Sequence, residues 1–150
     1  MRQMDHDFAS ELIERLEKIP AEAKPAWGKM SPDRMVNHLN ATFRYSMGKE
    51  VPSFYVGNFM TKYIFGPLIL KGILPIPKNI PIKRKFAEER NTPLPQAIAE
   101  LRVTLDDYLA AVQEGSMKPC EHPGFGDIGI DGWAVMHVRH CEHHLKQFGA

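Results

Sequence analysis

Apolar residues recur every three or four positions in four stretches of the chain, a spacing that gives an α-helix one apolar face. The four predicted helices cover residues 5–18, 30–47, 92–114 and 133–148. The helical wheel places Asn37 on the polar face of the second and Val112 on the apolar face of the third. Pro20 ends the first, and Gly115 ends the third because glycine readily takes the left-handed conformation that terminates a helix. Ser31–Pro32 and Thr92–Pro93 each place a proline after a residue type that caps helices.

The segment between the second and third of these helices, residues 48–92, has a looser pattern. Phe54, Phe59 and Tyr63 are spaced for a short helix that ends at or just beyond Tyr63. From Gly66 onward, prolines interrupt the apolar residues at a density that excludes a continuous helix or a central strand. We expect an irregular, proline-rich insertion whose apolar side chains cover part of the core or a partner subunit. Its basic cluster is expected to be solvated surface: Lys83, Arg84 and Lys85.

Four amphipathic helices and no clear strands predict an all-α protein, a four-helix bundle with one long insertion. The length of 150 residues suits a single domain over residues 1–150. A formal net charge of +1 gives no electrostatic reason to expect nucleic acid or an acidic membrane as partner. The most apolar region, residues 63–77, is too short to span a bilayer. No leader is recognised and Cys120 and Cys141 form no disulfide framework, so we expect a cytoplasmic protein with two free thiols.

The last predicted helix has an unusual composition, because four of the seven histidines fall within residues 137–144. At about 100° per residue, one face carries three imidazoles between two aromatic rings. Its members are Trp133, His137, His140, His144 and Phe148. Charged residues take the opposite face: Arg139, Glu142 and Lys146. Imidazoles on a face that points to the core must be satisfied by hydrogen bonds or by a metal ion.

His140 and His144 are four residues apart, so their rings stack on adjacent turns and can bind one ion. Glu142 points to the other side of the helix, which excludes the H-E-x-x-H metalloproteases. A third ligand must come from another helix, and His38 is the only histidine on such a core-facing stripe. Three neutral imidazoles leave positions open for water or substrate, as in catalytic sites. The alternative is a set of core histidines that are hydrogen-bonded to carbonyls or carboxylates.

A second ligand set also remains open. His137 shares the stripe and pairs at helical spacing with either His140 or Cys141, and a thiolate ligand would favour zinc. Gln147 is a candidate to orient a ligand imidazole. The other histidines are expected at the edge of the stripe, as a loop cap and on the surface: His143, His122 and His6, respectively.

Several of these residues form motifs. Trp27, Met30, Met35 and His38-Leu39 resemble the W-x-x-M-x-x-x-x-M-x-x-H-L segment of DinB-like (DinB/YfiT) proteins. The HP-x-FG loop at His122–Gly126, Trp133 and the H-x-x-H-H-x-x-Q-F-G ending resemble a branch of uncharacterised domains within that superfamily. The resemblance spans nearly the whole chain, and its closing motif is the more specific part.

The resemblance implies a four-helix bundle of DinB/YfiT type, often a homodimer, with the proline-rich insertion between the second and third core helices. It also implies a divalent metal such as zinc, nickel or iron, held by His38, His140 and His144. Characterised relatives include metal-dependent hydrolases and S-transferases that use low-molecular-weight thiols such as bacillithiol or mycothiol. The branch that this chain resembles most has no settled activity.

The function expected from the sequence is therefore a metal-dependent enzyme, a hydrolase or a low-molecular-weight-thiol S-transferase, that acts on a small-molecule substrate. The ion would lower the pKa of a bound water or thiol, and no residue stands out as a general base. The rival is a non-catalytic bundle, a binding or stress-related protein with structural histidines. Nucleic acid is not an expected partner, because neither the charge nor any motif supports it.

Overall fold

The computed structural model describes residues 2–49, 57–78 and 90–150, and within these ranges it contains helices and no strands. The elements are α1 (His6–Glu17), α2 (Pro32–Ser46), the π-helical turn η1 (Thr61–Phe65), α3 (Gly66–Leu70), α4 (Leu94–Glu114) and α5 (Gly129–Gln147). The prediction of an all-α protein is confirmed. None of the helices in the described ranges is long and apolar enough to cross a membrane.

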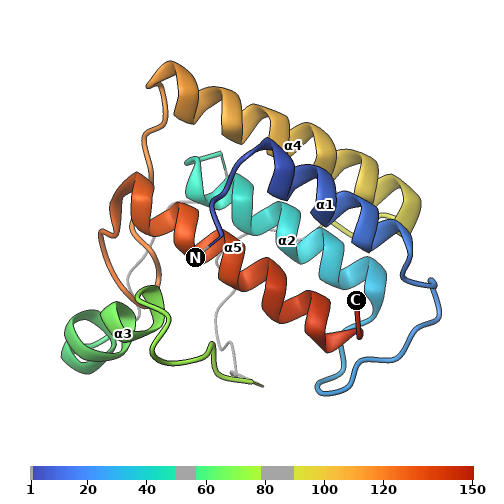
Figure 1. Ribbon diagram of the computed structural model, residues 1–150, viewed down its shortest axis with the longest axis horizontal. Helices are drawn as coiled ribbons and strands as arrows, with labels where there is room; N and C mark the ends of the chain where they lie inside the picture. The colour runs from blue at the N-terminus through green and yellow to red at the C-terminus, as the bar shows by residue number, and fades with distance from the viewer. Residues whose placement is uncertain (1, 50–56, 79–89) are drawn as a thin grey trace.

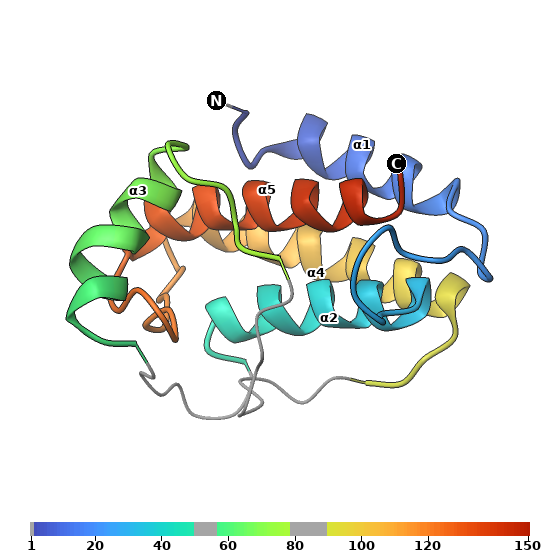
Figure 2. The same cartoon turned by 90° about the horizontal axis from the view of Figure 1, so that it is seen from below.

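The four longer helices lie side by side and enclose one core (Figure 1). Contacts join α2 to α4, α4 to α1, α1 to α5 and α5 back to α2, so each of the four touches two others. The turn η1 and α3 stand at one end of this group, beside the first half of α5 (Figure 2). The contact between α2 and α5 matters for function, because these two helices carry the histidines singled out above.

The core between the four helices is aliphatic, and each fully buried leucine in it contributes about 1.5–3 kcal/mol. Its most buried members are Leu16, Met35, Val36, Leu39, Leu101, Cys141 and Leu145. A second, aromatic cluster of Tyr45, Trp133 and Met136 lies near the start of α5, where Ile76 of the insertion and Phe125 of the HP-x-FG loop pack against it. The insertion therefore covers part of the core, as its apolar content predicted.

Two of the predicted helix starts differ in detail from the structure. Ser31 precedes Pro32 at the start of α2, but its side chain makes no capping hydrogen bond. At α4 the cap position is taken by Pro93, and the hydroxyl of Thr92 donates instead to the amide oxygen of Asn37 at 2.9 Å. The amide nitrogen of Asn37 donates to the Thr92 carbonyl, so these bonds join α2 to the start of α4. Asn37, placed on the polar face by the helical wheel, is therefore buried.

The other ends follow the sequence more closely. Asp5 caps α1 by accepting a hydrogen bond from the backbone N–H of Phe8 at 2.8 Å. Gly115 ends α4 in the left-handed conformation, with φ of +72°. Val112 was predicted on the apolar face of this helix but is 37% exposed, since it lies near the end of the helix. The last helix begins at Gly129, four residues before the predicted start at Trp133.

The insertion is more helical than predicted. Residues 59–70 form one helical run through η1 and α3, so the expectation of irregular structure from Gly66 onward is wrong for the first five residues. Pro67 has no N–H to donate, and the preceding turn is a wider π-turn in which the N–H of Gly66 bonds to the Thr61 carbonyl. After Leu70 the described chain is irregular to Lys78. The cluster at 83–85 lies outside the described residues.

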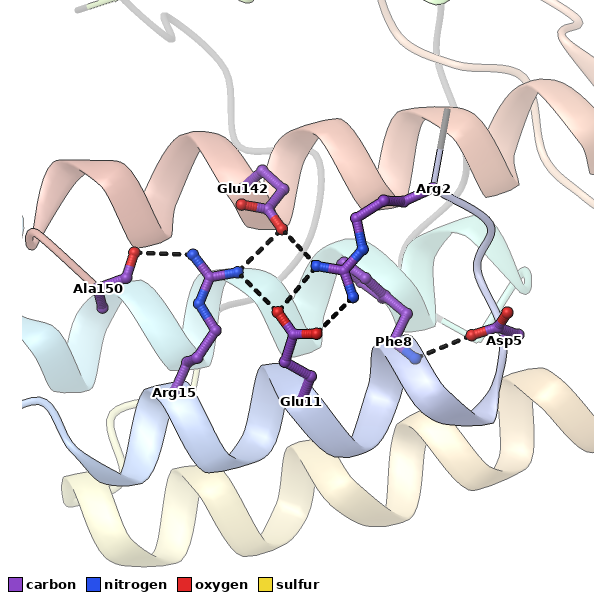
Figure 3. A network of polar contacts seen from close by, with 7 residues as sticks. All are labelled: Arg2, Asp5, Phe8, Glu11, Arg15, Glu142 and Ala150. Carbon is purple, nitrogen blue, oxygen red and sulfur yellow. Dashed lines mark hydrogen bonds and ion pairs between the residues drawn. The ribbon is translucent and has the colours of Figure 1, made fainter.

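An ion-pair network joins both ends of the chain to the bundle (Figure 3). Arg2 binds Glu11 on α1 at 2.6 Å and Glu142 on α5 at 3.2 Å. Arg15 binds Glu142 at 3.0 Å and donates to the carbonyl of Ala150 at 2.8 Å. Glu142 thus points away from the histidine stripe, as the helical wheel predicted.

Candidate metal centre

The structure brings together the three histidines that the sequence singled out. Nε2 of His140 lies 3.0 Å from Nε2 of His38 and 3.0 Å from Nε2 of His144. One ligand atom from each of the three lies within 4.8 Å of the others. His144 is buried, and His38 and His140 are half-buried. Within residues 2–49, 57–78 and 90–150, no other group of three histidine, cysteine or acidic side chains comes this close together.

Two elements position these rings. The i, i+4 spacing on α5 stacks His140 and His144 on adjacent turns, with ring centroids 4.7 Å apart. Because α2 packs against α5, His38 faces both, with centroids 4.9 Å from His140 and 5.2 Å from His144. All three ring pairs meet nearly edge to face, and the Nε2 atoms of His38 and His144 both lie next to that of His140.

Hydrogen bonds alone do not satisfy this arrangement. A neutral imidazole nitrogen carries either one proton or one lone pair, so Nε2 of His140 can make one well-directed hydrogen bond but has two nitrogen neighbours at 3.0 Å. Protonating the ring is no remedy, because burial and then the nearby His144 and His38 hold the pKa of His140 well below its usual range. His140 therefore stays neutral.

The partners of His144 identify which of its nitrogens holds the proton. The amide nitrogen of Gln147 donates to the carbonyl of Trp27 at 2.9 Å, which turns the amide oxygen of Gln147 toward Nδ1 of His144 at 2.8 Å. An amide oxygen only accepts, so Nδ1 of His144 carries the proton and donates it. Nε2 of His144 then presents a lone pair to the cluster. Such a bond from the outer nitrogen is the usual support of a metal-ligating histidine.

These residues fit a divalent cation. Imidazole nitrogens on a tetrahedral zinc lie about 2.0–2.1 Å from the metal and therefore about 3.3 Å from one another. The Nε2 separations of 3.0 Å from His140 to the other two rings are close to that value. Neutral imidazole is a donor that zinc, nickel and iron all accept. Three such ligands leave at least one coordination position for a small molecule.

His137 lies outside this cluster. Its Nε2 is 2.8 Å from the hydroxyl of Ser46, whose proton goes to the Phe43 carbonyl, so His137 donates and Ser46 accepts. Its ring stacks on Phe43 at 3.8 Å. Burial lowers the pKa of His137 to about 3, and the buried Nδ1 has no hydrogen-bond partner among the described residues. The alternative pairing of His137 with His140 is therefore not seen.

Cys141 also lies outside the cluster. It is fully buried among the aliphatic side chains of the main core. Burial raises the pKa of its thiol far above the usual range, so it stays protonated. The ligand set with a thiolate from Cys141 is thus not supported by the geometry.

The remaining histidines take the places predicted for them. Nδ1 of His122 accepts hydrogen bonds from the backbone N–H groups of Gly124 and Phe125, both at 3.1 Å, and the backbone of His122 pairs with Gly126. It thus caps the HP-x-FG loop, and burial lowers its pKa to about 4. The edge and surface positions are taken by His143, which is half-buried, and His6, which is exposed.

The sequence did not reveal the surroundings of the cluster. Trp27 contacts His143 edge to face, with centroids 5.4 Å apart, and His143 in turn meets His144 at 5.2 Å. The ammonium group of Lys78 lies 4.2 Å from the centre of the Trp27 ring. The i, i+3 spacing of His144 and Gln147 is a signal that could have identified their bond, but the contacts of Trp27 with residues far along the chain leave no periodic trace.

The comparisons with known proteins identify a family and nothing more specific. No curated protein and no solved structure matches the chain. One family model matches, over residues 1–150, and its description is a protein of unknown function (DUF1569). The chain therefore belongs to the DUF1569 family of proteins of unknown function.

Proposed function

We propose that this protein is a metal-dependent enzyme, a hydrolase or a low-molecular-weight-thiol S-transferase, whose divalent cation is held by His38, His140 and His144. The observation that carries the proposal is the convergence of three Nε2 atoms from two helices, two pairs of them at 3.0 Å. Imidazoles whose nitrogens face one another at this distance are stabilised better by a shared cation than by hydrogen bonds between the rings.

The proposal includes the fold type that the sequence suggested, a single-domain bundle of DinB/YfiT type. In its support, α1, α2, α4 and α5 pack in a closed circuit, and the insertion lies between α2 and α4, the second and third of the long helices. The homodimer and the cytoplasmic location that the sequence suggested stay predictions.

The residues of the chain have distinct roles in this proposal. His38, His140 and His144 would bind the cation, which would act as a Lewis acid and lower the pKa of a water or thiol that reaches it. Gln147 holds the proton of His144 on Nδ1 and so keeps the lone pair on Nε2, which faces the cluster. His38 and His140 are half-buried rather than fully buried, which favours access of a small molecule to the site. Glu142 takes no part, since it is bound to Arg2 and Arg15.

The test is metal analysis of protein purified without a histidine tag. We expect about one equivalent of zinc, nickel or iron in the wild type, and its loss in His38→Ala and His140→Ala. His6→Ala, which removes an exposed histidine from α1, is the matched control and keeps the metal. Metal that survives both cluster substitutions would refute the proposed ligands.

Activity decides between the enzyme and its rival. The loaded protein is screened with hydrolase substrates and with electrophiles in the presence of low-molecular-weight thiols, and His140→Ala serves as the inactive reference. Turnover that disappears in this variant supports an enzyme. A full metal complement without any turnover in the screen favours the non-catalytic binding protein.

A further inference from the structure

Four side chains form a rim beside the histidine cluster: Trp27, Lys78, His143 and Lys146. On α5, His140, His143 and Lys146 are three residues apart, so each is offset from the last by about 60° around the helix. The rim thus begins beside the cluster residue His140 and reaches Lys146, an exposed residue at the edge of the charged face of α5. Contacts between rings connect it to the cluster, from Trp27 to His143 and from His143 to His144.

The insertion delivers the second lysine to this rim. After α3 the chain returns across α5 (Figure 2), and Arg139 on α5 donates a hydrogen bond to the carbonyl of Leu74 at 2.7 Å. Four residues later the ammonium group of Lys78 rests over the Trp27 ring at 4.2 Å. Lys78 is therefore held in place by an aromatic ring while its charge stays exposed.

The positive charge of the rim is not neutralised by the protein. In the part of the chain that the structure describes, neither Lys78 nor Lys146 has a carboxylate within ion-pairing distance. Both lysines flank His143, because Lys78 rests over the Trp27 ring that contacts His143 and Lys146 follows His143 at i+3 on α5. Glu142, one turn before Lys146 on the same charged face of α5, is bound to Arg2 and Arg15 instead.

The cluster adds to this imbalance. Three neutral imidazoles would leave both positive charges of a bound divalent cation uncompensated, because the ligand set contains no carboxylate or thiolate. A cluster and a rim that are both short of negative charge attract an anion more strongly than either one does alone.

We propose that Lys78 and Lys146 bind an oxyanion, a carboxylate or phosphate group, of the small molecule whose reacting end lies at the three histidines. This inference rests on the proposed function for the role of the site, but not for the existence of the anion site. Trp27 holds the ammonium group of Lys78 in place, and ring contacts lead from Trp27 through His143 to His144.

The first experiment does not need a metal. The chain has two tryptophans, Trp27 on the rim and the buried Trp133, whose indole N–H donates to the Cys120 carbonyl. The full chain, treated with chelator, is titrated with inorganic phosphate at constant ionic strength while both indole N–H signals are followed by NMR. We expect a saturable shift of the Trp27 signal and none of the Trp133 signal.

Substitutions locate the anion. Lys78→Gln and Lys146→Gln should each raise the midpoint of the phosphate titration about threefold to fivefold. Lys118→Gln is the control, because Lys118 is an exposed lysine in the loop before α5 and has no carboxylate partner among the described residues. A Trp27 shift that never saturates, or midpoints equal to that of the wild type in both rim variants, overturns the proposal.

The second experiment links the rim to the cluster. Cobalt-loaded protein is titrated with 3-mercaptopropionate and with its neutral amide, and the thiolate–cobalt absorption band reports binding. We expect the carboxylate probe to bind more tightly and the preference to shrink in Lys78→Gln and Lys146→Gln; an unchanged preference overturns the link. Failure to bind cobalt refutes the proposed function instead, and the phosphate titration still decides whether the anion site exists.

Discussion

The amide oxygen of Gln147 accepts a hydrogen bond from Nδ1 of His144 at 2.8 Å, one helical turn along α5. The other end of the same amide donates to the Trp27 carbonyl at 2.9 Å, so the amide cannot turn over without placing its nitrogen against an N–H and its oxygen against a carbonyl. A backbone atom of the loop before α2 thereby determines which nitrogen of His144 faces the cluster.

Gln147→Met should weaken metal binding about 10- to 100-fold, because it keeps the volume of the side chain and removes the acceptor that holds the proton of His144. The measurement is competition for zinc with a chromophoric chelator. Gln113→Met, at an exposed position of α4, is the control and should bind zinc like the wild type. Equal affinities in the two variants would mean that packing alone orients the imidazole.

Zinc should raise the melting temperature of the wild type. A ligand that binds only the folded state at 100 times its Kd stabilises it by about 2.7 kcal/mol, which corresponds to about 5–11 °C for a chain of this size. The measurement is thermal unfolding by circular dichroism with zinc and with chelator. His144→Ala should lose the difference between the two conditions, and His6→Ala should keep it. A chelator-insensitive wild type would contradict a metal bound by the native state.

The four long helices and the grouping of the three histidines could be predicted from the sequence, because each depends on residues that recur at helical spacing. The i, i+4 pair on the last helix and a lone histidine on an apolar stripe of another could be recognised before any coordinates. Asn37 was misplaced because its burial depends on hydrogen bonds to Thr92, 55 residues away. The helical residues from Gly66 to Leu70 were missed because the π-turn before Pro67 lets the helix continue through a proline. The position of Lys78 could not be predicted, because its segment has no periodic pattern and its contact with Trp27 is seen only in the structure.

His137→Phe should flatten the dependence of stability on pH. The pKa of His137 is about 3 in the folded protein and about 6.5 in an unfolded chain. At a pH between these two values the imidazole is protonated in the unfolded state and neutral in the folded state. Stability is therefore complete above about pH 6.5 and falls as the pH drops, by up to about 1.4 kcal/mol per pH unit from this residue. Phenylalanine keeps the stacking on Phe43 and removes this dependence.

Urea unfolding at pH 7 and pH 5 measures the effect. Wild type should lose about 2 kcal/mol more than His137→Phe between the two pH values. His122, whose pKa is about 4, contributes the same sign of dependence to both proteins and cancels from the comparison. His6→Gln is the control for an exposed histidine and should follow the wild type. Parallel pH profiles for wild type and His137→Phe would show that the buried imidazole is accommodated when charged.

The ion-pair network in Figure 3 predicts that removing the Glu11 carboxylate lowers stability, and that this loss disappears in acid and in high salt. The hydrogen bond from Arg2 holds the pKa of Glu11 below its usual range, so the carboxylate stabilises the fold above the ordinary pKa of glutamate. That contribution is lost as the pH falls through the lower pKa of the folded state. Glu11→Gln should thus melt below the wild type at pH 7, and the two should converge in acid and in 1 M salt, where charges are screened beyond about 3 Å.

Glu14→Gln is the matched control, since Glu14 is exposed on the same helix and has no ion-pair partner among the described residues. It should melt with the wild type at every pH. Both carboxylates pair with Arg2 and Arg15, but Glu142→Gln should cost more than Glu11→Gln because Glu142 is the less exposed of the two. Equal melting temperatures of Glu11→Gln and Glu14→Gln at pH 7 and low salt would mean that hydration of the charges cancels the stabilisation from the ion pairs. The N-terminal arm would then be held by the packing of Met4 and Phe8 against the core.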